Sequence, residues 1–175
     1  MIRCKGPYML GFIISEKPGQ ADAILQQLAQ DLIVQGVRLT GAVQETTRLS
    51  ANQKKSMALH LLPDGPLIGI SQDLGPMATG CSLDPDGLEQ AVGLMAAALE
   101  RQPQILLLNK FGKQEAEGRG VRPLIGEALA RDIPVLIGVG REKLPLFQAF
   151  AGDMAQELPR DLPALLDWCQ QHMTV

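Results

Sequence analysis

The segment from Gln104 to Arg122 constrains the fold of this chain more than any other. It opens with four consecutive apolar residues, Ile105 to Leu108, and then changes abruptly to polar and glycine-rich sequence. A short apolar run of this kind predicts a strand that is buried on both faces, as in a parallel sheet. A parallel sheet needs helices on both of its faces, so the segment predicts an α/β fold.

Polar side chains follow this strand at the point where it is expected to end. In an open parallel sheet, ligands bind outside the carboxyl ends of the strands. Three glycines, Gly112, Gly118 and Gly120, would let the backbone approach a ligand closely. The candidate ligand-binding residues of this segment are Asn109, Lys110, Gly112, Lys113 and Arg119.

The same charged residues have a simpler interpretation. Lys110, Lys113, Glu115 and Glu117 could form nothing more than a solvated charged surface at the start of a loop. We favour a binding site because these residues follow directly on a buried strand and lie among glycines. Lys113 and Arg119 are then the expected cationic contacts of an anionic ligand.

Strands and helices alternate along the rest of the chain. The expected strands cover residues 8–15, 37–44, 56–62, 66–72, 134–139 and 153–157. The expected helices cover residues 21–35, 124–131, 143–150 and 162–172, with a further helix that begins near Asp84-Pro85. Residues 45–55 are polar and are expected to form a loop. The two strands at 56–62 and 66–72, joined by Pro63-Asp64-Gly65, predict an antiparallel hairpin at one edge of the sheet.

This pattern predicts one three-layer α/β domain over residues 1–175, with a mostly parallel sheet. The first strand, the helix at 21–35 and the strand at 37–44 are expected to form a βαβ unit. Gly36 is the expected stop of that helix.

Composition limits the classes of function. A net charge of −3 over 175 residues gives no overall attraction to nucleic acid or to an anionic membrane, so neither partner is expected. The apolar run at residues 8–14 is too short to span a bilayer, so no membrane insertion is expected. Cys4, Cys81 and Cys169 are far apart and only two histidines accompany them, which predicts neither a disulfide framework nor a zinc site. A cytoplasmic location is the expectation.

The loop at residues 16–23 lies where a phosphate-binding P-loop would lie. That motif, Gly-x-x-x-x-Gly-Lys-Ser/Thr, uses freed backbone N–H groups, a lysine and a metal-binding hydroxyl to hold phosphates. Aligned with it, this chain has Asp22 at the lysine position and Ala23 at the hydroxyl position. The central strand likewise ends in Asn109 and Lys110, where a phosphate-hydrolysing protein would have a carboxylate that holds Mg²⁺. The residues therefore predict that hydrolysis has been lost.

Several motifs together point to a family. They are Pro18-Gly19, Ser71-Gln72-Asp73-Leu74-Gly75, Cys81-Ser82-Leu83-Asp84-Pro85 and the run Asn-Lys-Phe-Gly-Lys-Gln-Glu-Ala-Glu-Gly-Arg-Gly that begins at Asn109. In these motifs the chain resembles a bacterial domain-of-unknown-function family of small proteins that are commonly encoded near molybdate-uptake genes. That family is similar to the small P-loop nucleoside triphosphatases, with degenerate motifs. The resemblance implies a P-loop-NTPase-like fold and a site at the carboxyl edge of the sheet, and it implies no activity.

Two classes of function stay open. The first is a non-hydrolysing regulatory or accessory protein that holds a nucleotide or an oxyanion, with a link to molybdate uptake if the family's gene neighbourhood is informative. The second is a nucleoside triphosphatase or phosphotransferase with a non-standard active site. The missing metal carboxylates favour the first class.

Two further loops contribute candidate ligand-binding residues, namely Pro18, Gly19, Gln20, Ser71, Gln72 and Asp73. Asp73 has an alternative role as the cap of a turn. The sequence identifies no cofactor, and it leaves open a homo-oligomer or a protein partner.

Overall fold

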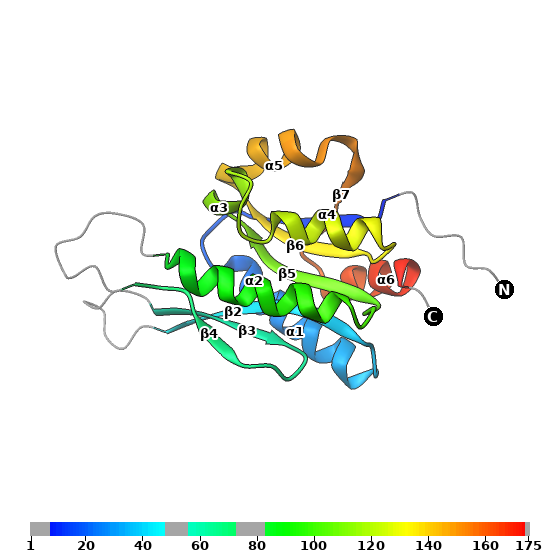
Figure 1. The fold of residues 1–175 in the computed structure, drawn as a ribbon. Coiled ribbons are helices and arrows are strands. Elements are labelled where there is room, and N and C mark those ends of the chain that lie inside the picture. The colour runs from blue at the N-terminus through cyan, green and yellow to red at the C-terminus, as the bar shows by residue number, and fades with distance from the viewer. Residues whose placement is uncertain (1–7, 48–55, 73–82, 174–175) are drawn as a thin grey trace.

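A sheet of seven strands, with helices on both faces, forms the framework of the protein (Figure 1). The computed structural model describes residues 8–47, 56–72 and 83–173. Across the sheet the strand order is β4-β3-β2-β5-β6-β1-β7. The strands are β1 (Leu10–Ser15), β2 (Leu39–Thr47), β3 (Ser56–Leu62), β4 (Leu67–Gly69), β5 (Ile105–Phe111), β6 (Val135–Gly140) and β7 (Ala155–Glu157).

The pairing of the strands confirms the predicted fold class. Strands β2, β5, β6, β1 and β7 pair in parallel, whereas β3 pairs antiparallel with both β2 and β4. The fold is therefore α/β with a mostly parallel sheet and an antiparallel hairpin at one edge. Strand β5 lies in the middle, between β2 and β6, and Ile105 to Leu108 are at most 1% exposed.

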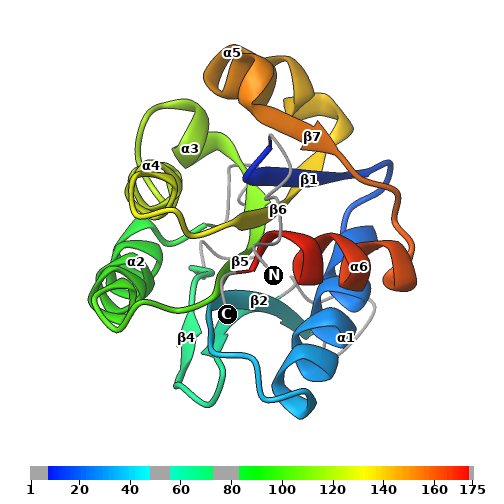
Figure 2. The same ribbon diagram turned by 90° about the vertical axis from the view of Figure 1, so that its right-hand side faces the viewer.

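Helices cover the two faces of this sheet (Figure 2). They are α1 (Gln20–Val34), α2 (Pro85–Leu99), α3 (Lys113–Ala116), α4 (Arg122–Ala130), α5 (Leu144–Ala151) and α6 (Leu162–His172). Helices α1 and α6 pack on one face, where Leu107 and Leu136 meet their apolar side chains. Helices α2, α4 and α5 pack on the other face against Leu106, Leu108 and Ile137. None of the helices in the described parts of the chain is long and apolar enough to cross a membrane.

The ends of two helices follow the sequence signals. Asp84 caps α2 by accepting a hydrogen bond from the backbone N–H of Asp86 at 3.0 Å, and Pro85 occupies the first helical position. Helix α1 ends just before Gly36, which has a φ of 76°. A left-handed residue at this place is the usual glycine stop of a helix.

Strands β1 and β2 are parallel members of one sheet and are joined by α1, with β6 and β5 between them. Two expectations about the strands are corrected. Residues 45–47 belong to β2 rather than to a loop, because they pair with β3 and this pairing outweighs their polar composition. The strand expected at 66–72 is reduced to Leu67–Gly69, and Ser71 forms only an isolated bridge to Leu83.

Candidate functional site

The sheet splits at its centre, where β2 separates from β5. The two strands pair only from Leu39 with Ile105 to Gly41 with Leu107, after which β2 continues beside β3 alone. Strand β5 runs on to Phe111, so Asn109 and Lys110 lie within it rather than after it, and its register with β6 shifts between Leu108 and Phe111. The carboxyl edge of the sheet is therefore open on one side of β5.

The side chain of Asn109 bridges this split. Its oxygen accepts a hydrogen bond from the backbone N–H of Gln44 on β2 at 2.9 Å, and its nitrogen donates to Asp22 Oδ1 on α1 at 3.1 Å. Asn109 is 5% exposed. An amide suits this place because it can accept one bond and donate the other, whereas a carboxylate could only accept and would repel Asp22. Asn109 thus holds β2, β5 and α1 together.

A cleft of about 560 Å³ opens where the strands diverge. Its mouth is formed by the loop at residues 17–19, by residues 109–115, and by residues 138–140, 142 and 143 at and after the end of β6. Its interior is lined by apolar side chains of β2, β3 and α2. The cleft therefore lies at the carboxyl edge of the sheet, as predicted for the site.

Charged side chains surround the mouth of this cleft. Four lysines line it, Lys17, Lys110, Lys113 and Lys143, together with three carboxyl groups, Asp22, Glu115 and Glu142. Lys17, Lys113 and Lys143 form no ion pair with any residue that the structure describes. The mouth thus carries an excess of positive charge in a chain whose net charge is −3.

Glu115 is buried, so the alternative of a solvated charged surface does not apply to this carboxyl group. Its side chain belongs to α3 and is 5% exposed. Burial raises the pKa of Glu115 to about 7, although backbone amides of Val121 and Gly112 and the charge of Lys110 act in the opposite direction. Near pH 7 the group is therefore present in both its protonated and its ionised form.

A turn through Gly120 encloses this carboxyl group. Gly120 has a φ of 61°, and a Cβ added there would lie 2.8 Å from the carboxyl carbon of Glu115. Both conditions require glycine at this position. The pair Gly118 and Gly120, following soon after Glu115 in the sequence, is the signal that could have indicated a turn folded over a side chain.

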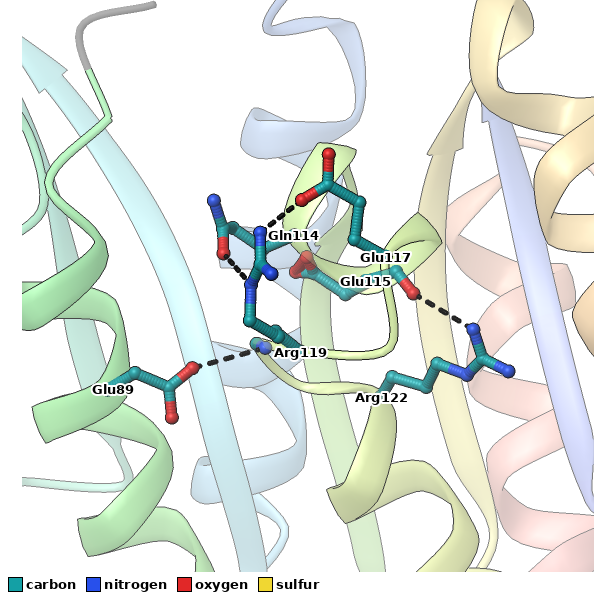
Figure 3. A network of polar contacts seen from close by, with 7 residues as sticks. Glu89, Gln114, Glu115, Glu117, Arg119 and Arg122 are labelled. Carbon is teal, nitrogen blue, oxygen red and sulfur yellow. Dashed lines mark hydrogen bonds and ion pairs between the residues drawn. The ribbon is translucent and has the colours of Figure 1, made fainter.

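Arg119 does not line the cleft, and its side chain joins a network of polar contacts (Figure 3). Its guanidinium is paired with the carboxylate of Glu117 and donates a further hydrogen bond to Gln114 Oε1 at 2.9 Å. Beside it, the backbone N–H of Gly120 donates to Glu89 on α2 at 3.2 Å. The charge of Arg119 is thus neutralised on the outer side of the turn.

The first loop is held by contacts of its own. Glu16 forms an ion pair with Arg141, which lowers the pKa of Glu16, and its backbone N–H donates to Gln20 Oε1 at 2.7 Å. Gly19, with a φ of 77°, precedes the first residue of α1. Asp22 lies in the first turn of α1 and lines the cleft. Its negative charge interacts favourably with the positive N-terminal end of the helix dipole. An anion bound at this helix end would be repelled by the carboxylate of Asp22.

The structure brings together six of the predicted site residues. Those that line the cleft are Pro18, Gly19, Asn109, Lys110, Gly112 and Lys113. Gln20, Ser71, Gln72 and Arg119 do not line it. Ser71 Oγ accepts the backbone N–H of Met57 at 3.0 Å and Gln72 Nε2 donates to the Leu83 carbonyl at 2.6 Å, so both side chains hold local structure. Asp73 lies outside the described residues.

A metal centre of the usual kind is not seen in the described parts of the chain. No group of three or more His, Cys, Asp or Glu side chains there could hold a metal ion.

Comparison with known proteins places the chain in a family. A family model described as "Protein of unknown function (DUF2478)" matches residues 10–168. The chain belongs to the DUF2478 family. This confirms the family resemblance that the motifs predicted.

A longer protein is similar to most of this DUF2478 chain. The chain is 32% identical over 162 residues to "Molybdenum import ATP-binding protein ModC 2" of Bradyrhizobium diazoefficiens. The match covers 93% of this chain but only 18% of that protein, so the chain spans less than a fifth of the length of this relative. This similarity to an ATP-binding protein is consistent with the P-loop-NTPase-like α/β fold of the DUF2478 chain. No solved structure matches the chain significantly.

Proposed function

We propose that this DUF2478 protein binds an anionic small molecule in the cleft, in a regulatory or accessory role in the cytoplasm, and does not hydrolyse it. The observation that carries the proposal is the excess of positive charge at the mouth, which is lined by four lysines and three carboxyl groups, and burial raises the pKa of one of these carboxyl groups, Glu115. Clustered charge in a cleft attracts counter-ions even when the whole chain is acidic. The name of the ModC relative suggests a nucleotide or molybdate as the anion, and a role in molybdate uptake.

The Asp22–Asn109 contact supports the non-hydrolysing half of the proposal. In a phosphate-hydrolysing site, a lysine and a metal-bound carboxylate neutralise charge that develops on the transferred phosphoryl group. Here the corresponding side chains are a carboxylate and an amide that hydrogen-bond each other at 3.1 Å. Neither is free to neutralise a phosphate.

The first prediction concerns turnover. Purified protein with Mg²⁺ and either ATP or GTP is expected to release phosphate no faster than a buffer blank, because the groups that stabilise the transferred phosphoryl are missing. A continuous phosphate-release assay measures this. The alternative function, a nucleoside triphosphatase with a non-standard site, is favoured by one observation, the buried carboxyl of Glu115 in the cleft. Turnover that stays with the protein through purification and disappears in Glu115→Gln would establish that alternative.

The second prediction compares two cations that are six residues apart. A thermal-shift screen of ATP, GTP, molybdate, sulfate and phosphate first identifies an anion that raises the melting temperature. Lys113→Ala is then expected to weaken the binding of that anion about tenfold or more, because it removes an unpaired cation from the mouth. Arg119→Ala is the matched control and is expected to change affinity by less than about twofold, since its charge is paired with Glu117 outside the cleft.

Isothermal titration calorimetry measures both affinities. Both side chains are largely exposed, so the two variants should fold alike. An equal loss of affinity in the two variants, or a loss in Arg119→Ala alone, would show that the anion binds outside the cleft.

A further inference from the structure

The cleft has two chemically different parts. The mouth carries the lysines, whereas the interior passes between α2 and the sheet and is lined by Met57 and Leu59 of β3, Leu88 and Met95 of α2, and Leu108 of β5. The two parts are continuous within one cavity of about 560 Å³. A ligand that fills the cavity must therefore satisfy a cationic end and an apolar end at the same time.

The volume of the cavity exceeds the needs of a simple oxyanion. Sites for drug-sized organic ligands measure about 300–1,000 Å³, and a water molecule takes up about 30 Å³ of the liquid. A tetrahedral oxyanion has only five heavy atoms and would leave most of the interior without a partner. Apolar walls favour an apolar group over water, because burying that group removes its surface and theirs from solvent.

Two polar side chains of β2, Gln44 and Thr46, line the cleft beside its apolar interior. Gln44 and Thr46 point to the same side of β2 as Ala42, because side chains alternate along a strand. Gln44 Nε2 donates to Thr46 Oγ1 at 3.1 Å, and the backbone oxygen of Gln44 accepts a bond from Gln26 at 2.7 Å. With Gln44 and Thr46 as the polar side chains on these walls, a nucleobase in this space would leave most of its own donors and acceptors without a partner, which is costly when they are buried. The walls favour an aliphatic or aromatic group instead.

We infer that the ligand of this cleft is an amphipathic organic anion, with its charged head group among the lysines of the mouth and its apolar body between α2 and the sheet. The inference rests on the proposed function and names the class of molecule that the site takes. Lys113 and Lys110 contact the head group. The apolar body contacts Met57, which is partly exposed, and Leu59 and Leu88, which are 5% and 6% exposed. An inorganic oxyanion occupies only the mouth and binds weakly.

A series of alkyl phosphates tests this inference on the unmodified protein. Methyl, butyl and octyl phosphate carry the same head group and differ only in the apolar body, and each is titrated below its micellar concentration by calorimetry. The affinity is expected to rise about fourfold for each added methylene until the interior is full. Octanol, which has the longest body and no charge, is expected to bind far more weakly than octyl phosphate.

Two variants assign the gain to the two parts of the cleft. Lys113→Ala is expected to weaken all the alkyl phosphates by a similar factor of about ten. Ala42→Leu adds bulk to the interior wall and is expected to abolish the dependence on chain length while methyl phosphate binds as before. Circular dichroism and the melting temperature show whether Ala42→Leu folds, and the series on the unmodified protein decides the question if it does not.

The outcomes separate this inference from the proposal beneath it. A flat series, in which butyl and octyl phosphate bind no better than methyl phosphate, overturns the amphipathic ligand and leaves anion binding intact. The inference is also overturned if octanol binds as tightly as octyl phosphate and Lys113→Ala leaves the affinities of the alkyl phosphates unchanged. The head group would then play no part in binding. If no alkyl phosphate binds and the screen of inorganic anions and nucleotides is also negative, the proposed function itself fails.

Discussion

Replacing Gly41 by alanine is expected to destabilise the protein by about 3–5 kcal/mol. Gly41 is the last residue of β2 that pairs with β5, and it also pairs with Leu62 of β3. Its φ is 131°, and a Cβ added there would lie 1.8 Å from the backbone oxygen of Leu107. Because the obstructing atom belongs to the backbone of a central strand, it cannot move aside as a flexible side chain would.

Urea unfolding of the unmodified protein and of Gly41→Ala measures this loss of stability. The matched control is Gly126→Ala in α4, where an added Cβ meets no atom within 4 Å. That variant is expected to be as stable as the unmodified protein or more stable by up to about 1 kcal/mol, because alanine favours a helix interior. If Gly41→Ala unfolded at the same urea concentration as Gly126→Ala, the close approach of β2 and β5 would be wrong.

The buried carboxyl of Glu115 is expected to make stability fall as the pH rises from about 4.5 to about 7. Its pKa is raised from 4.5 to about 7 in the folded protein, so in this range the folded state binds more protons than the unfolded state. Its contribution is fully present below pH 4.5 and is lost as the pH rises through the folded-state pKa. The shift corresponds to about 3 kcal/mol, at about 1.4 kcal/mol for each pKa unit.

Glu115→Gln removes this titration and keeps the size of the side chain. Unfolding free energies are measured in urea at pH 5 and pH 8 for the unmodified protein and for the variant. The loss between the two pH values should be smaller in Glu115→Gln by about 2–3 kcal/mol. The control Glu117→Gln changes an exposed carboxylate two residues away and should follow the unmodified protein. If all three proteins lost the same unfolding free energy between pH 5 and pH 8, the pKa of Glu115 would be that of a solvent-exposed carboxyl group.

The parts of the site that could be predicted are those that depend on local position. Asn109, Lys110 and Lys113 line the cleft because they follow a buried apolar run, and that run is visible in the sequence. The Asp84-Pro85 cap of α2 is local in the same way. Such signals depend on residues that are neighbours in the chain, so they can be recognised without knowledge of the whole fold.

The parts that could not be predicted depend on contacts between distant segments or on backbone direction. Arg119 turns away from the cleft and Glu115 turns inward because of the path of the chain through Gly118 and Gly120, whose φ values are 85° and 61°. The polar end of β2 is a strand because β3 lies beside it. The buried apolar run, the glycines and the charged residues identified the segment as a candidate site, but they could not show which of its side chains face the same space.

The bridge from Asn109 to Asp22 and Gln44 also limits how such a site can change in evolution. Restoring a carboxylate at position 109 alone would remove the donor to Asp22 and set two negative charges side by side. Restoring a lysine at position 22 alone would leave the Asn109 N–H without its acceptor. Positions 22 and 109 are therefore epistatic, and a mutational path between this cleft and a metal-dependent phosphate site passes through a less stable protein unless both residues change together.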